Sequence, residues 1–145
     1  MTLLFPARID NEFRGHRLGL WLFALVMLAK TAIAFGTIFN GRAAAETADG
    51  IPLDSFGAAG AHAFLTVFAM WGLAQLVPGA LATIALLRYR AMIPLLYLVF
   101  LLEHTARRVL LFTHPLASGV APGWHINVGL VALMVIGLIV SLRPR

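Results

Sequence analysis

The sequence predicts an all-α fold: an integral membrane four-helix bundle with both termini in the cytoplasm. Three observations predict it. Hydrophobic residues make up 61% of the chain and charged residues only 12%, which is about half the charged share of a soluble domain. The apolar residues are gathered into four long blocks, and most arginines lie outside these blocks. All 145 residues, 1–145, are therefore expected to form a single transmembrane domain.

The four apolar blocks cover residues 18–39, 59–87, 91–112 and 122–142. A helix rises about 1.5 Å per residue, so each block is long enough to cross a hydrocarbon layer of about 30 Å. A short cytoplasmic segment, residues 1–17, is expected before the first helix. An outer loop, residues 40–58, follows that helix, and a second outer loop rich in Pro and Gly precedes the fourth.

Local sequence signals mark the ends and the packing of these helices. Asn40-Gly41 has the turn chemistry to end the first helix. Asp54 or Ser55 is placed to cap the second, which is rich in glycine and alanine and is therefore expected to pack closely against its neighbours. Pro78 and Pro94 are expected to kink the second and third helices.

The arginines outside the apolar blocks indicate the orientation in the membrane. Only Arg42 lies in an outer loop, while the cytoplasmic segments hold the others: Arg8, Arg14, Arg17, Arg88, Arg90, Arg143 and Arg145. Basic residues favour the cytoplasmic side. We therefore expect a multi-pass protein of a bacterial-type inner membrane or plasma membrane. The net charge of +5 is explained by this topology, and with no basic helix or RNA-binding motif a nucleic-acid partner is not expected.

The first helix also resembles a secretory signal, because Arg14 and Arg17 precede it and three alanines, residues 43–45, follow it. Its apolar run is longer than a signal core and contains Lys30. A retained helix is the prediction, and cleavage before Glu46 is the alternative.

Two ionisable residues lie deep inside the predicted spans, Lys30 in the first and Glu103 in the third. Such a charge costs about 2.5 to 3.5 kcal/mol on insertion scales, so each needs a partner or a wet cavity. Lys30 follows Arg17 by 13 residues and Glu103 follows Arg90 by 13 residues, which places both at about 20 Å from the inner surface. Equal depth predicts an ion pair, which is either purely structural or part of a functional site.

The stretch EHTARR, residues 103–108, adds charge to the same region. On a helix Glu103 and Arg107 share a face, and His104 and Arg108 form a second pair one step round. Arg108 is close enough to the outer headgroups to serve as an interfacial anchor.

Asn127 of the fourth helix and His62 of the second are expected to converge on the same outer half of the bundle. The sequence thus predicts a polar pocket that binds a ligand. Its predicted lining is Lys30, His62, Glu103, His104, Arg107 and Asn127.

Two functions are compatible with this pocket. In the first, the protein binds a small molecule or a lipid headgroup, with Lys30 and Arg107 holding an anionic group while Glu103 and His104 handle a proton. In the second, it is a non-catalytic accessory subunit of a larger membrane complex, bound to another membrane protein or to a second copy, and the Lys30–Glu103 pair is architectural. Membrane lipid is a partner in both.

Catalysis and cofactors are less favoured by the sequence. Glu103 and His104 could act as acid and base, but the chain has no nucleophile motif, HExxH motif, acidic metal cluster or phosphate loop. The absence of cysteine excludes Cys-ligated iron–sulfur clusters. A b-type haem needs two facing histidines, and His62 and His104 are expected at different depths. The sequence therefore favours neither an enzyme, a metal site nor a haem, and the identity of any cofactor stays open.

The stretch GLAQLVPGALATIALLRYRAMIPLLYLV, residues 72–99, resembles the middle hairpin of the DoxX-like small four-helix membrane proteins. Both have small residues and leucine, a short Arg-x-Arg turn and then a second apolar helix. The resemblance implies a four-helix bundle and, through members linked to sulfur and quinone oxidation, a quinone-linked complex. Lys30 and the EHTARR stretch are not matched to that family.

Overall fold

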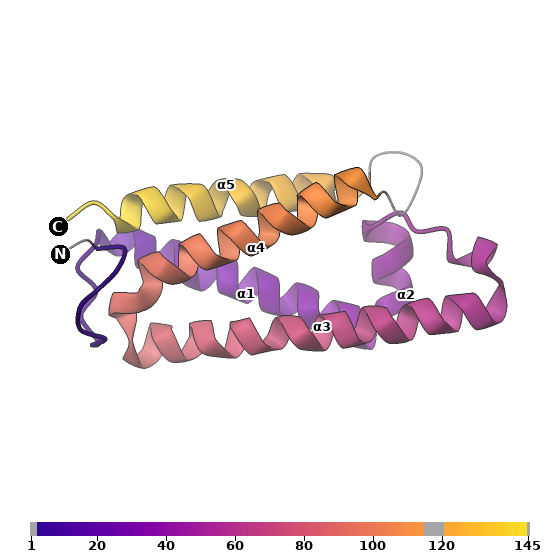
Figure 1. Cartoon of the computed structure of the whole chain (residues 1–145), viewed down its shortest axis with the longest axis horizontal. Helices are drawn as coiled ribbons and strands as arrows, with labels where there is room; N and C mark the ends of the chain where they lie inside the picture. Colours follow the sequence, from indigo (N-terminus) through magenta and orange to yellow (C-terminus); the bar gives the residue numbers. More distant parts are fainter. Residues whose placement is uncertain (1–2, 115–120, 145) are drawn as a thin grey trace.

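The structure is a computed structural model that describes residues 3–114 and 121–144. Within these residues the regular secondary structure is helical, apart from one isolated bridge between Gly15 and Pro144, and residues 3–16 form turns and irregular backbone. The predicted all-α class is therefore confirmed. Four long helices run along the molecule (Figure 1): α1 (Arg17–Phe39), α3 (Gly57–Arg88), α4 (Ile93–Thr113) and α5 (Trp124–Ser141). Both termini lie at one end, called here the termini end, and the opposite end is called the distal end. Residues 115–120 of the predicted second outer loop lie outside the described residues.

The helix α1 has a clear start and a clear stop. Nδ1 of His16 accepts a hydrogen bond from the backbone N–H of Leu18 at 3.2 Å, which caps the first turn. The backbone N–H of Asn40 donates to the carbonyl of Gly36 at 2.8 Å and closes the last turn. The predicted end at Asn40-Gly41 is therefore confirmed.

The predicted outer loop, residues 40–58, is not an open loop. It contains the short helix α2 (Gly41–Ala43), the π-helical turn η1 (Ala44–Ala48) and the 3-10 turn η2 (Leu53–Phe56). Ala45, Ile51 and Leu53 are buried and pack with Ala61 of α3 in a second hydrophobic cluster. These apolar residues hold the segment over the distal end and let η1 contribute to the site described below.

The prediction that Asp54 or Ser55 caps the second long helix is wrong. Oδ1 of Asp54 lies 3.3 Å from Nη1 of Arg42, and the Ser55 hydroxyl donates to a backbone carbonyl three residues earlier at 2.7 Å. The helix α3 instead begins at Gly57, with Phe56 before it making no side-chain capping bond. Gly57 has φ +68°, a conformation that glycine adopts without a Cβ clash.

The helix α3 is 32 residues long and packs mainly against α1. Its small residues make this packing close, as predicted. A Cβ added to Gly72 would lie 3.1 Å from the Ala34 carbonyl of α1, and Ala82 is fully buried. Pro78 lies inside α3, whereas Pro94 lies in the first turn of α4, where its missing N–H removes no helical hydrogen bond. The predicted kink at Pro94 therefore has no basis there.

The turn between α3 and α4 consists of Tyr89 and the 3-10 turn η3 (Arg90–Met92). From this turn α4 runs toward α5, and it packs far more against α5 than against α3. The core between α1, α4 and α5 centres on Tyr97, whose ring meets Phe23 edge-on at 5.0 Å between centroids. The Tyr97 hydroxyl donates to the carbonyl of Gly19 at 2.8 Å, so one fully buried side chain ties α4 to α1.

The N-terminal segment is folded onto the termini end. The Phe13 ring packs against the main core, and the Asp10 carbonyl accepts a hydrogen bond from the Ala91 N–H at 3.2 Å. Gly15 contacts the last turn of α5 so closely that an added Cβ would meet the Ser141 carbonyl oxygen. The N-terminal segment is therefore fastened to the same end of the molecule as the last turn of α5.

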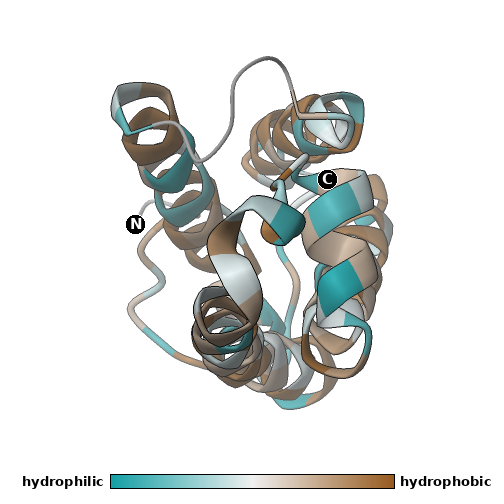
Figure 2. Cartoon of the chain, turned by 90° about the vertical axis from the view of Figure 1, so that its right-hand side faces the viewer, coloured by the Kyte–Doolittle hydropathy of each residue, from teal (hydrophilic) through white to brown (hydrophobic). Residues whose placement is uncertain are grey.

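Within the described residues, α1, α5 and the stretch of η2 plus α3 are long and apolar enough to cross a membrane. The helix α4 is not among them, because it carries Glu103, Arg107 and Arg108. Large apolar side chains are exposed along the outside of the long helices, among them Trp21, Leu28, Val67 and Phe112. Figure 2, which looks at the distal end, shows hydrophobic residues over most of these helices.

Candidate functional site

Glu103 of α4 connects three helices through its carboxylate. Its Oε2 accepts from Nζ of Lys30 in α1 at 3.2 Å. Its Oε1 accepts from a guanidinium nitrogen of Arg107 at 2.7 Å and from the side-chain amide of Gln75 in α3 at 3.3 Å. The ion pair that equal depth predicts is present, and it is the centre of a larger polar network.

Aromatic rings support the two cations of this network. Nζ of Lys30 lies 5.8 Å from the ring centroid of Phe100, and the Arg107 guanidinium carbon lies 4.9 Å from that of Trp71. Such cation–π contacts strengthen when the site is shielded from water. Trp71 also stacks on Phe68 at 5.6 Å between centroids, so the surface beneath Arg107 is itself held in place.

A cavity of about 120 Å³ lies beside this network at the distal end. All four long helices and η1 contribute to its lining. Its polar lining residues are Lys30, Asp49, Trp71, Gln75, His104, Arg107, Arg108 and Asn127. Its apolar walls include Ile33 of α1 and Leu130 of α5. Gly123, which directly precedes α5, also lines the cavity. The cavity is smaller than the roughly 300–1,000 Å³ typical of drug-sized ligands, so it suits a small polar group.

Four buried nitrogen atoms at this cavity have no hydrogen-bond partner within the described chain. They are Nδ1 and Nε2 of His104, Nε of Arg107 and Nε of Arg108. His104 is only 3% exposed. Leaving such a group unpaired costs about 1–3 kcal/mol, and buried polar groups are nearly always paired. Three of the four are donors, because a neutral imidazole has one N–H and one acceptor nitrogen, and their concentration on one and a half turns of α4 marks this cavity as a place that lacks acceptor atoms.

The charge around the cavity is positive. Lys30, Arg107 and Arg108 bring three cations, against the two carboxylates of Glu103 and Asp49. Burial raises the pKa of the Asp49 carboxyl above its ordinary value of 3.8, and the charges of Arg108 and Arg107 oppose that rise. The site therefore favours an additional negative group.

Four of the six predicted site residues line the cavity: Lys30, His104, Arg107 and Asn127. The amide nitrogen of Asn127 donates to the Gly123 carbonyl at 2.9 Å, which leaves its oxygen as an acceptor. Glu103 does not line the cavity; it positions Lys30, Gln75 and Arg107, which do.

The prediction that His62 lines the pocket is wrong. Its side chain is exposed on α3 and is not part of the lining. Proximity to the outer end of a helix gives no information about the direction in which a side chain points, which is why the prediction failed.

Sequence reasoning missed four of the polar lining residues: Asp49, Trp71, Gln75 and Arg108. Gln75 has Glu103 as its partner. The available signal was its position within an apolar span, where an amide needs a partner. Asp49 reaches the cavity because η1 folds over the distal end. No sequence pattern predicts that π-helical turn.

In the described residues, no group of three His, Asp or Glu side chains is arranged to hold a metal ion. Comparison with known proteins gives no match: no family model, curated protein or solved structure is significantly similar to this chain.

Proposed function

We propose that this chain is a multi-pass membrane protein whose four long helices all cross the bilayer, with both termini in the cytoplasm. The apolar character of α1, α3 and α5 supports insertion. Two of the charges of α4 do not oppose it, because Glu103 and Arg107 are paired with each other and Glu103 also with Lys30, and Arg108 lies near the outer end of the helix, where it can reach the headgroups. The arginines Arg17, Arg88 and Arg90 gather at the termini end, which supports a cytoplasmic location for that end.

Within this protein, the distal cavity binds a small anionic molecule or the anionic headgroup of a lipid. The observation that carries this proposal is the set of four unpaired buried nitrogens on His104, Arg107 and Arg108. A carboxylate or phosphate oxygen would satisfy several of them at once, and charge-assisted hydrogen bonds of this kind are the strong ones. The positive charge balance favours such a group over a neutral one.

The residues around the cavity divide into two roles. Arg107, Arg108 and Lys30 attract the anion, and His104 provides one ring N–H donor and one acceptor in its neutral form. Glu103 keeps Lys30 and Arg107 oriented without occupying the cavity. The apolar walls exclude water, which strengthens each of these interactions.

The test is ligand retention by purified protein. The full chain is isolated in a mild detergent, its small molecules and lipids are identified by mass spectrometry, and carboxylates and phosphates are then screened for a rise in melting temperature. Arg108→Gln and His104→Leu should each abolish the rise. Arg42→Gln removes the same charge as Arg108→Gln from the same end, where Arg42 is exposed and paired with Glu46, and should leave the rise unchanged.

The stability of the variants without ligand distinguishes a ligand-binding residue from a structural one. Because His104 has no partner among the described residues, His104→Leu should not destabilise the protein in the absence of ligand. If a ligand raised the melting temperature of Arg42→Gln and of Arg108→Gln by the same amount, this result would contradict the proposal.

The second candidate is a non-catalytic accessory subunit of a larger membrane complex. The observation that favours it is that Glu103 satisfies Lys30, Gln75 and Arg107 without any ligand, as a purely structural network would. The resemblance to DoxX-like proteins suggests a quinone-linked complex. Recovery of a partner at stoichiometric yield, unaffected by His104→Leu, would favour this candidate.

A further inference from the structure

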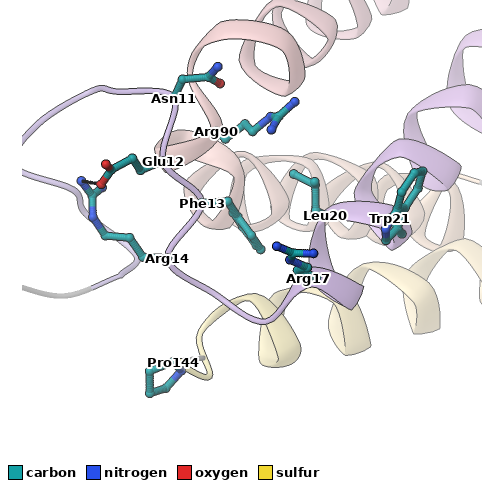
Figure 3. Close-up of a pocket in the computed structure, with 9 residues that line it drawn as sticks. All are labelled: Asn11, Glu12, Phe13, Arg14, Arg17, Leu20, Trp21, Arg90 and Pro144. Carbon is teal, nitrogen blue, oxygen red and sulfur yellow. Dashed lines mark hydrogen bonds and ion pairs between the residues drawn. The ribbon is translucent and has the colours of Figure 1, made fainter.

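A second, larger cavity lies at the termini end and has no part in the proposed function. Its volume is about 780 Å³, and its lining comes from the N-terminal segment, the first turns of α1, the turn η3 and Pro144 (Figure 3). This volume falls in the range of sites for whole small molecules or headgroups, rather than single ions.

The arginines of this cavity are of two kinds. Arg14 is neutralised, because its guanidinium bonds to Asp10 and lies 3.2 Å from a carboxylate oxygen of Glu12. Arg17 and Arg90 form no ion pair with any residue that the structure describes. Nε of Arg90 donates to the backbone carbonyl four residues earlier at 2.9 Å, which anchors the side chain and leaves its terminal amino groups for a ligand.

Apolar side chains lie between the two unpaired arginines. In Figure 3, Phe13 and Leu20 lie between Arg90 and Arg17, and Trp21 stands at the side of the cavity. Trp21 is 71% exposed and follows Arg17 by one helical turn. Tryptophan is enriched at the membrane interface, at the level of the lipid headgroups. The cavity therefore combines cationic groups with an apolar wall.

We propose that this cavity binds the headgroup of an anionic phospholipid from the cytoplasmic leaflet. The phosphate accepts hydrogen bonds from the guanidinium groups of Arg17 and Arg90, and the glycerol and first acyl carbons pack against Leu20 and Trp21. Arg14 offsets one of the two charges of Asp10 and Glu12, so together with Arg17 and Arg90 these five groups carry a net charge of +1, which favours an anionic headgroup. Basic pockets between helices on the cytoplasmic side are known to suit anionic headgroups.

The lining favours a lipid over a free anion. A free phosphate has no apolar part to pack against the exposed indole of Trp21 or against Leu20, and it would fill only a small part of the cavity. The proposal depends on the membrane insertion proposed above, but it is independent of the distal cavity.

The test uses the full chain in nanodiscs made from equal parts of phosphatidylcholine and phosphatidylglycerol. Lipids that stay bound after mild detergent release are counted by native mass spectrometry. A basic residue that lies directly against an anionic headgroup strengthens its binding about fivefold. We therefore expect Arg17→Gln and Arg90→Gln each to lower the preference for phosphatidylglycerol by about fivefold, and the double variant to lower it by at least about tenfold.

The matched control is the double variant Arg88→Gln with Arg143→Gln. Both residues are exposed at the termini end and neither lines the cavity, so the control removes the same charge from the same surface. It should keep the preference for phosphatidylglycerol. An equal loss in both double variants, or no loss in either, would overturn the proposal, as would displacement of the lipid from the unmodified chain by 10 mM inorganic phosphate.

A second measurement needs no arginine substitution. In the variant Trp71→Phe with Trp124→Phe, Trp21 is the one remaining tryptophan, and brominated phosphatidylglycerol should quench its fluorescence more strongly than brominated phosphatidylcholine at equal mole fraction. Equal quenching would overturn the proposal. Failure of the chain to enter nanodiscs would refute membrane insertion itself, whereas entry without lipid preference would refute only this site.

Discussion

At the scale of single residues, Lys30 depends on Glu103 for its charge partner, whereas Glu103 has other partners besides Lys30. Glu103 has three donors, Lys30, Gln75 and Arg107, while the described structure gives the Lys30 ammonium one carboxylate and one aromatic ring. The side chain of Lys30 is only 12% exposed. Removal of the two partners should therefore have unequal effects.

Lys30→Met should lower the free energy of unfolding by about 1–3 kcal/mol, because Glu103 keeps Arg107 and Gln75. Glu103→Gln should cost more, about 3–5 kcal/mol, because it leaves two cations without a carboxylate. The double variant should cost less than the sum of the two. Unfolding in mixed micelles measures all three.

Arg42→Gln is the control for these substitutions, since Arg42 is exposed and should contribute less than about 1 kcal/mol. If the double variant costs the full sum of the single variants, the two residues are not energetically coupled.

Asp49 gives the site a pH dependence. Because burial raises its pKa in the folded protein, the native state binds more protons than the unfolded chain from the ordinary value of 3.8 upward. Its contribution to stability is therefore fully present below that value and is lost as pH rises through the folded pKa. Asp49→Asn should flatten this slope and raise the melting temperature at pH 7.

Melting curves of the unmodified chain and Asp49→Asn between pH 4 and 8 measure this effect. Asp49 shares the cavity with Lys30, His104, Arg107 and Arg108, so Asp49→Asn should also strengthen anion binding at neutral pH. A steeper loss of stability with rising pH in Asp49→Asn would show that ion pairing of this carboxylate, rather than its burial, dominates.

At the scale of elements, glycine sets how closely α5 approaches its neighbours. A Cβ added to Gly137 would lie 2.3 Å from the Tyr97 hydroxyl oxygen. Tyr97 is fully buried and bonded to Gly19 of α1, so it has no room to move. The helices α1, α4 and α5 therefore pack together around Gly137 and Tyr97.

Gly137→Ala should lower the free energy of unfolding by about 2–3 kcal/mol through overpacking against Tyr97. Gly129→Ala is the matched control on the same helix, because no atom lies within 4 Å of its added Cβ. It should be neutral or stabilising by up to about 1 kcal/mol. Thermal unfolding in detergent compares them, and equal stabilities would contradict the packing described for Tyr97.

At the scale of the whole molecule, the two ends differ in composition. The termini end carries the bridge between Gly15 and Pro144 and several exposed arginines. In the described segments that join the long helices at the distal end, the arginine present is Arg42, which is paired with Glu46 and Asp54. Such a difference in free basic charge favours insertion with the termini end in the cytoplasm.

The absence of cysteine in the chain allows a direct test of this orientation. Glu46→Cys at the distal end should react with a membrane-impermeant maleimide in intact cells. Tyr89→Cys, in the turn between α3 and α4, should react only after permeabilisation. The opposite pattern would reverse the proposed orientation, and reaction of both in intact cells would contradict insertion.

The sequence by itself determined the helices and the depth of the charged residues along them. Long apolar blocks leave the backbone no alternative to helix if they enter lipid, and their limits agree with α1, α3, α4 and α5 to within two residues at each end. Position along a helix converts directly into height, which is why the partnership of Lys30 with Glu103 could be predicted before any contact was known.

Only the tertiary structure decided which way each side chain points and how residues 40–58 fold. Height leaves the rotation of a helix about its axis undetermined, so His62 was assigned the wrong surroundings and Gln75 was not recognised as a partner of Glu103. That rotation is set by close packing, such as Gly72 on α1 and Tyr97 on Gly137, which involves residues far apart in the chain. The same packing brings Asp49 over α4 and so completes the cavity.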